Sequence, residues 1–229
     1  MARTDSPIAL ATLAAASGSL DVTAFSRFGG VFTSVMTSNL VFIAIAAARA
    51  EATLAVHCGA ALAGYVAGVA VGSALAHSDG QENRLGAKAV STVLGLECAL
   101  LVAIAVWWIT LDAHPTSGQQ SVLLAIAALA MGLQGASARE IMGQHNAGTT
   151  YLTGTLTGVV SAFATGRRPD PLALLSLGGL LVGAGIGAVL LENAPGTSAL
   201  PPAAALVFVS VLSWRRRRID ARVRNSPAN

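Results

Sequence analysis

Apolar residues gather into eight long runs separated by short polar stretches. The runs cover approximately residues 7–26, 31–48, 53–76, 89–111, 120–138, 149–165, 171–191 and 199–214. A helix needs about 20 apolar residues to cross the hydrocarbon core of a bilayer, and only helices or closed barrels satisfy the backbone there. Because the runs lack the strict alternation of barrel strands, the sequence predicts an all-α polytopic membrane protein with eight hydrophobic helical segments.

Composition supports this fold class and excludes several functions. Hydrophobic residues make up 54% of the 229 positions and charged residues only 11%, whereas a soluble domain carries about 25% charged residues. A chain with so few charges is not a soluble enzyme, a nucleic-acid-binding domain, a disulfide scaffold or a disordered protein. We expect one transmembrane domain over residues 1–229.

The net charge of +3 comes largely from the C-terminus. Six of the 14 basic residues follow the last apolar run: Arg215, Arg216, Arg217, Arg218, Arg222 and Arg224. Arginines directly after an apolar segment are typical of a cytoplasmic stop that attracts anionic lipid. Residues 215–229 are therefore predicted to be a disordered, basic, cytoplasmic tail, and nucleic acid is not expected as a partner.

The chain contains an internal duplication. Gly64, Gly68 and Gly72 recur 115 residues later as Gly179, Gly183 and Gly187. The polar stretch TSVMTSNL (33–40) likewise has a counterpart, TTYLTGTL (149–156), displaced by 116 residues. Shared features in one order at one spacing predict two homologous four-segment halves, over about 7–111 and 120–214.

The glycine spacing itself predicts close helix packing. Glycines at every fourth position make a smooth groove that lets two backbones approach closely. The partner helix belongs either to the same chain or to a second copy in a homo-oligomer, and the sequence leaves both interpretations open.

The number of spans also stays open. If all eight segments cross and the N-terminus is inside, the basic residues before the tail divide equally between the two sides. If segments two and six are broken or re-entrant, six of those eight residues lie inside, which agrees better with the positive-inside rule. The halves would then be inverted repeats, a common transporter plan. Against this, an 18-residue apolar segment more often simply crosses.

Polar side chains inside apolar segments mark candidate sites, because they are costly in hydrocarbon. Two acids, Asp21 and Glu97, are candidates for proton coupling. Five residues are candidates for substrate binding: Thr37, Asn39, Gln134, Thr153 and Thr155. Structural interpretations compete with these. Asp21 could pair with Arg27 at the interface, Glu97 could be a neutral acid bonded to a neighbouring helix, and the threonines could bond to their own helix and bend it.

No pattern of a cofactor or metal site is present. The sequence lacks a nucleotide-binding loop and the HExxH, CxxC and GxSxG motifs. Cys58 and Cys98 stand inside apolar runs and are interpreted as small buried residues. We therefore expect no metal and no cofactor.

The order of the polar motifs resembles the YoaK-like family of bacterial inner-membrane proteins. The resemblance rests on GSLD (18–21), GGVFTSVMTSNLV (29–41), MGLQGASAR (131–139) and TTYLTGTLTGV (149–159). The characteristic positions are Asp21, Phe32, Thr37, Asn39, Gln134, Thr153, Gly154 and Thr155. The chain departs from the pattern at Ser38, where the family has glycine. The resemblance implies a protein of the bacterial inner (plasma) membrane with a permease-like role, and it supplies no substrate.

These observations favour a small-solute permease or secondary transporter with a polar site between the two repeats and both termini in the cytoplasm. Its partners would be the lipid bilayer and a small solute. A non-transporting scaffold or sensor is one alternative. A membrane-embedded enzyme that uses Asp21 or Glu97 as acid or base is another, disfavoured because no nucleophile or metal cluster accompanies them.

Overall fold

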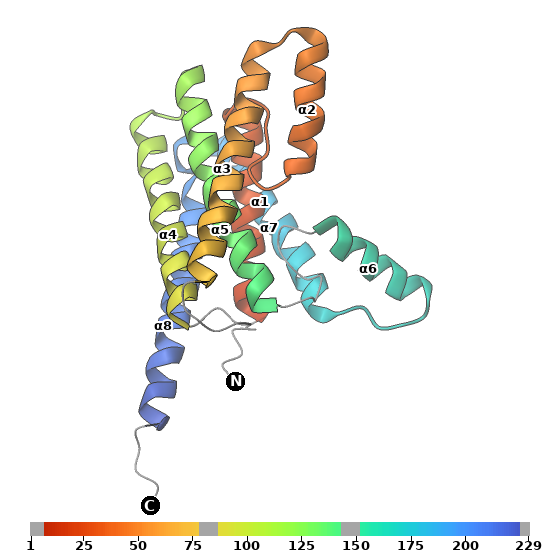
Figure 1. The fold of residues 1–229 in the computed structure, drawn as a ribbon, viewed down its shortest axis with the longest axis vertical. Helices are drawn as coiled ribbons and strands as arrows, with labels where there is room; N and C mark the ends of the chain where they lie inside the picture. The colour runs from red at the N-terminus through yellow and green to blue at the C-terminus, as the bar shows by residue number, and fades with distance from the viewer. Residues whose placement is uncertain (1–6, 78–86, 143–151, 225–229) are drawn as a thin grey trace, which may run out of the picture.

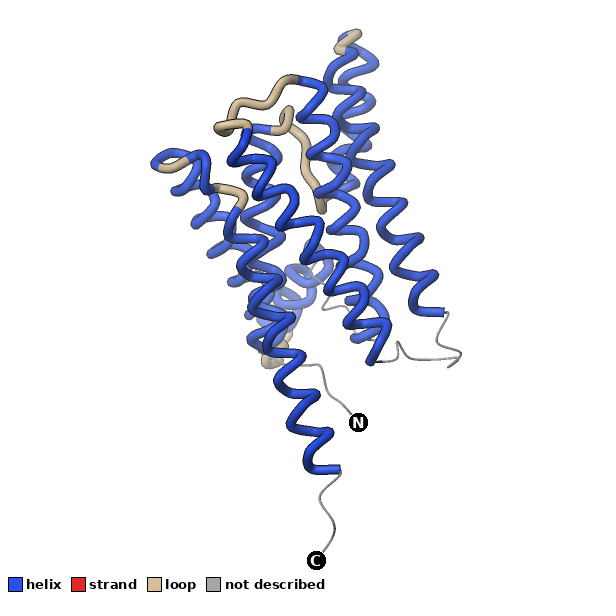
Figure 2. Tube along the Cα trace, turned by 90° about the vertical axis from the view of Figure 1, so that its left-hand side faces the viewer, coloured by secondary structure: helices blue, strands red, loops and turns tan. Residues whose placement is uncertain are grey.

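The computed structural model describes residues 7–77, 87–142 and 152–224. Within them the chain forms helices joined by loops, and no strand (Figure 2). The elements are α1 (Pro7–Arg27), α2 (Met36–Arg49), α3 (Ala52–His77), α4 (Ala87–Thr110), α5 (Ser117–Met142), α6 (Leu152–Ala164), α7 (Pro171–Asn193), the short 3-10 helix η1 (Pro195–Thr197) and α8 (Leu200–Arg224). The all-α prediction is confirmed for the described residues.

Six stretches of the described residues are long and apolar enough to cross a membrane. They lie in α1, α3, α4, α5, α7 and the η1–α8 region from Pro195 to Leu212. The runs at 31–48 and 149–165 form the two shorter helices, α2 and α6; residues 149–151 lie outside the described part. A helix rises about 1.5 Å per residue, so α2, with 14 residues, covers only part of the roughly 30 Å hydrocarbon thickness.

The long helices alternate in direction. In the view of Figure 1, α1, α4 and α7 run toward the upper end of the bundle, and α3, α5 and α8 return. Helix α2 begins at about mid-height beside α3 and runs to the upper end, whereas α6 begins at about mid-height beside α7 and runs outward toward the lower end. The first residue of α1 and the last residue of α8 both lie at the lower end.

Two helix pairs pack most closely, α3 against α5 and α1 against α7. Glycines form the contact in both. A Cβ atom on Gly64 or Gly68 would overlap the backbone of Ala125 or Leu129 on α5, and one on Gly72 would overlap Ala136. In the other pair, Gly179, Gly183 and Gly187 meet the backbone of Ala11, Ala15 and Ser19 on α1. All six glycines of the two repeated spacings therefore face helices of their own chain.

The partner helices contribute glycines of their own. Gly132 on α5 lies against the carbonyl oxygen of Tyr65, and Gly18 on α1 lies against that of Leu180. Small residues from both sides thus bring the two backbones of each pair into direct contact. Such close approach is how helices associate in lipid, where apolar side chains gain little from leaving the acyl chains.

Aromatic packing closes the upper end of the bundle. Trp108, near the end of α4, is fully buried, and its indole Nε1 donates a hydrogen bond of 2.8 Å to the carbonyl oxygen of Pro195. The buried ring of Phe28, just after α1, meets it edge-on at 5.3 Å. These contacts join the ends of α1 and α4 to the η1 connection.

Helix α8 continues beyond its membrane-spanning part to Arg224. The prediction of a disordered tail is therefore wrong for residues 215–224, whereas residues 225–229 lie outside the described part. Arginine is a good helix former, and a helix that is already nucleated within the membrane extends at little cost.

The glycine contacts predict a position-specific effect of a single methyl group. Gly183→Ala forces α7 away from Ala15, and we expect overpacking of this kind to cost about 1–3 kcal/mol. Gly185→Ala is the matched control on the same helix, because a Cβ atom there meets nothing within 4 Å. Thermal unfolding of the purified protein in detergent checks this. We expect a lower midpoint for Gly183→Ala and an unchanged or slightly higher one for Gly185→Ala, and equal midpoints would contradict the packing.

Candidate functional site

The chain leaves helical geometry between α1 and α2, at residues 28–35. Gly29 and Gly30 have φ values of +102° and +77°, a region that other residues rarely adopt. A side chain at Gly29 would also overlap the ring of His57 on α3. The glycine pair therefore lets the chain turn back from the upper end toward mid-height, where α2 begins.

The carboxylate of Asp21, on α1, accepts hydrogen bonds from residues of this turn. Its Oδ1 accepts hydrogen bonds from the amide and hydroxyl of Thr33, both at 2.7 Å, and from the amide of Ser34 at 3.0 Å. The hydroxyl of Ser34 donates to Oδ2. Asp21 is only 7% exposed, and these donors, not Arg27, are its partners. The carboxylate therefore satisfies backbone groups that a helix would otherwise pair.

Asn39 holds the same segment from α2. Its Oδ1 accepts from the amide of Phe32 at 3.2 Å, and its Nδ2 donates to the carbonyl oxygen of Phe32 at 2.7 Å. The side chain is fully buried. The Asn39 side chain therefore pairs with both backbone groups of Phe32, as a neighbouring β-strand would. A direct contact between Asn39 and a substrate stays a prediction.

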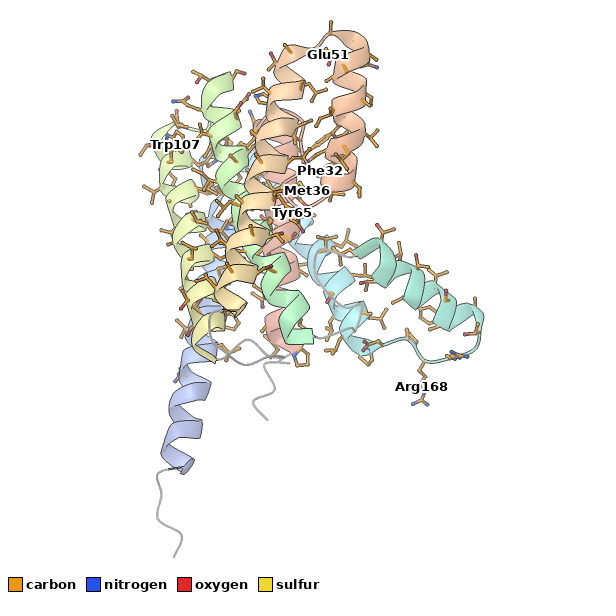
Figure 3. The ribbon with its side chains drawn as sticks, viewed as in Figure 1. Phe32, Met36, Glu51, Tyr65, Trp107 and Arg168 are labelled. Atoms are coloured by element: carbon orange, nitrogen blue, oxygen red, sulfur yellow. The ribbon has the colours of Figure 1, made fainter. Side chains whose placement is uncertain are left out.

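Three phenylalanines stack where the turn meets the two helices. The rings of Phe25 and Phe32 lie 4.9 Å apart, and those of Phe32 and Phe42 lie 6.4 Å apart, each pair nearly parallel. Figure 3 shows Phe32 and Met36 at the mid-height end of α2. The sequence does not predict this stack, because positions 25, 32 and 42 share no helical period. Their only signal was the presence of Phe32 in a family motif.

The remaining substrate-binding candidates lie in different environments. Thr37 and Thr153, in the first turns of α2 and α6, are exposed, and Thr155 is buried. Helix α2 packs against α3, and α6 packs against α7. Each hydroxyl-bearing helix therefore contacts a helix of its own half. Gln134 on α5 is 3% exposed and donates from Nε2 to the carbonyl oxygen of Leu13 on α1, at 3.3 Å.

Glu97 stands apart from the turn. It lies on α4, is fully buried, and neither carboxyl oxygen has a hydrogen-bond partner in the described part of the chain. The expectation that it bonds to a neighbouring helix is not met there. Among the described residues, no group of three or more His, Cys, Asp or Glu side chains is arranged to hold a metal ion.

Comparisons with known proteins place the chain in a family. Residues 9–213 match the family model described as "Protein of unknown function (DUF1275)", so the chain belongs to that family. It is 28% identical over 151 residues to "UPF0700 transmembrane protein YoaK" of Bacillus subtilis (strain 168). The matched region covers 66% of this chain and 64% of that relative, slightly less than two thirds of its length. No solved structure matches. The YoaK-like resemblance is thus confirmed, and the chain is a multi-pass membrane protein.

The hydrogen bonds of Asp21 predict a structural cost for its loss. In Asp21→Asn, the amide nitrogen replaces an acceptor oxygen that faces donors from Thr33 and Ser34. Hydrogen bonds to a charged group contribute about 1.5–3 kcal/mol each, so we expect a fall of roughly 5 °C or more in the unfolding midpoint. Asp112→Asn, at an exposed loop position, is the control and should leave the midpoint unchanged. A similar midpoint for both variants would show that Asp21 does not hold the turn.

Proposed function

We propose that this member of the family is a small-solute permease, or secondary transporter, built from two inverted halves of about 7–111 and 120–214. Its solute site would lie where the halves meet. The observation that carries the proposal is the correspondence between the two glycine-lined helix pairs.

The correspondence holds contact by contact. Gly64 meets Ala125, and Gly179 meets Ala11; the two glycines are 115 residues apart and their two partners are 114 residues apart. Gly68 with Leu129 and Gly183 with Ala15 repeat these displacements. So do the reverse contacts, in which Gly132 faces Tyr65 and Gly18 faces Leu180. A single operation that relates α1 to α5 and α3 to α7 would account for both glycine-lined helix pairs.

The helix directions favour inversion. Helices α1 and α5 run in opposite senses, as do α3 and α7 (Figure 1). The short helices follow the same relation, since α2 turns back to the upper end and α6 to the lower end. Inverted repeats with interrupted helices that begin near the membrane midplane are a common transporter plan. In each glycine-lined pair, α3 with α5 and α1 with α7, a helix of one half packs against a helix of the other.

We assign the solute site to the mid-height region between the halves. Gln134, which bonds α5 to α1, and the first turns of α2 and α6, which carry Thr37 and Thr153, are its proposed polar groups. Thr155 and Asn39 would act beside them, Asn39 by holding the start of α2. The amino-terminal ends of the two short helices would favour a negatively charged or dipolar group there.

Charge favours one orientation in the bacterial plasma membrane. Arg167 and Arg168 follow α6, and Arg215 follows the membrane-spanning part of α8, all at the lower side, whereas Arg27 and Arg49 end α1 and α2 at the upper side. Since basic residues concentrate on the cytoplasmic side, we assign the lower end and both termini to the cytoplasm.

Inversion predicts opposite accessibility for two loops. In a background with Cys58→Ala and Cys98→Ala, we expect Glu51→Cys to react with an impermeant maleimide in intact cells. Arg168→Cys should react only after the membrane is opened. Glu51 and Arg168 lie at opposite ends of the bundle (Figure 3). Labelling of both from one side would instead indicate that α2 and α6 cross, and would exclude the inverted halves.

Transport predicts a ligand whose binding and flux depend on the same residues. A thermal-shift screen of the purified protein against amino acids, sugars, nucleosides and organic acids should yield a stabilising solute, whose flux is then measured in proteoliposomes. We expect Gln134→Ala to abolish both the shift and the flux. The control is Gln119→Ala, in the first turn of α5, where the side chain accepts an exposed hydrogen bond from Thr116. Binding without flux in the unaltered protein would favour a sensor.

A further inference from the structure

The fully buried carboxyl of Glu97 is the group that the contacts described so far leave unexplained. It has no exposed surface, and both oxygens lack a hydrogen-bond partner within the described residues. The other buried side-chain atoms in this condition are hydroxyls of Ser19, Ser176 and Ser210, which are neutral. Glu97 alone among them can carry a charge, and a polar group buried without a partner is costly.

No cation pairs with Glu97 among the side chains that the structure describes. Helix α4 packs against α5, α8, α3 and η1. The first basic residue of α5 is Arg139, near its lower end, and the first of α8 is the exposed Arg215. No ion pair within the described residues includes Glu97. Within the described residues, a carboxylate at this position would therefore be buried without an opposite charge, which is strongly unfavourable.

The other titratable side chains described on these helices do not supply a countercharge either. His57 on α3 lies beside Ser117, where its Nε2 is 3.3 Å from the carbonyl oxygen, at the upper end of the bundle. Glu97 precedes the end of α4 by thirteen residues, or about 20 Å along the helix. The phenol of Tyr65 on α3 and the thiol of the adjacent Cys98 cannot carry a positive charge, and η1 has no titratable side chain.

A metal cation fits the position poorly. Hard cations take several oxygen ligands at once, and Glu97 belongs to no cluster of three or more acidic, histidine or cysteine side chains in the described part of the chain. A single proton needs only one oxygen. It neutralises the group and removes the cost of burying its charge.

We propose that Glu97 is a proton-binding site in the interior of the membrane domain, and that Asp21 is not. The four donors around Asp21 satisfy an ionised carboxylate, and a proton added at Oδ2 would require the Ser34 hydroxyl to change from donor to acceptor. Glu97 has no such bonds to lose when it gains a proton. Its use as the coupling site rests on the proposed transport function, whereas proton occupancy does not.

The first test is chemical. Dicyclohexylcarbodiimide enters lipid and reacts with protonated carboxyl groups in apolar surroundings. We incubate the purified protein in lipid nanodiscs with this reagent across a range of pH and locate adducts by peptide mass spectrometry. The expected result is an adduct on Glu97 that decreases as pH rises, is lost in Glu97→Gln and is kept in Asp21→Asn. An adduct on Asp21 that persists in Glu97→Gln would overturn the assignment.

The second test does not depend on access of the reagent. Infrared spectra of the unaltered protein should contain the carbonyl band of a protonated carboxyl without hydrogen bonds, at the high-frequency end of its range, and Glu97→Gln should lose it. Glu97→Asp should keep a shifted band, and the unfolding midpoint of each variant reports whether it folds. Absence of this band from the unaltered protein at neutral pH would refute the proton site. Neither test requires a solute, so failure of transport and failure of the site remain distinguishable.

Discussion

The bundle depends on how closely two pairs of helix backbones approach each other. Apolar side chains gain little by leaving lipid for another helix, so association relies on close packing and short contacts. Glycines on α3 and α7 place the backbones of α5 and α1 directly against them. The glycine contacts between α1 and α7 end at Ser19, two residues before Asp21. The packing that joins these helices therefore also fixes the position of the Asp21 carboxylate.

A second constraint follows from the first. Because the helix pairs pack closely, residues 28–35 form their turn inside the upper half of the bundle. An unpaired backbone group costs several kcal/mol there. Asp21 and Asn39 meet this requirement with side-chain groups in place of a helical ladder. Asp21 and Asn39 therefore have a physical reason to be aspartate and asparagine that does not depend on transport.

Much of the helical architecture was predictable, because hydropathy is a local property that sums along the chain. The start of α2 was not, because residues 31–35 belong to the predicted apolar run. The amides of Phe32, Thr33 and Ser34 bond to the side chains of Asn39 and Asp21 instead of to helical carbonyls. The glycine spacing predicted a groove on α3 and α7 but did not identify the helices that pack into it. The partners of Asp21 were likewise hidden, because Thr33 reaches it only through the path that Gly29 and Gly30 allow. The lack of a partner for Glu97 is a property of packing that no sequence pattern reports.

The arrangement leaves unequal roles for polar groups within one transmembrane domain. The chain itself supplies hydrogen-bond partners to Asp21 and Asn39, whereas Glu97 has none among the described residues. Satisfied polar groups rigidify the region around them. The hydrogen-bonded pair therefore lies on α1 and α2, and the carboxyl without a described partner lies on α4.

The difference between α2 and α6 has a consequence for local stability. Helix α2 is tied to the bundle through buried Asn39, while the position 114 residues after Asp21 is Gly135, which has no side chain to hold a turn before α6. Most of the α6 surface is exposed, and the helix packs chiefly against α7. Regions with few buried contacts open at lower free energy, so backbone amides of α6 should exchange with solvent deuterium earlier than those of α2. Fluctuations of the molecule would then be concentrated at one face of the membrane.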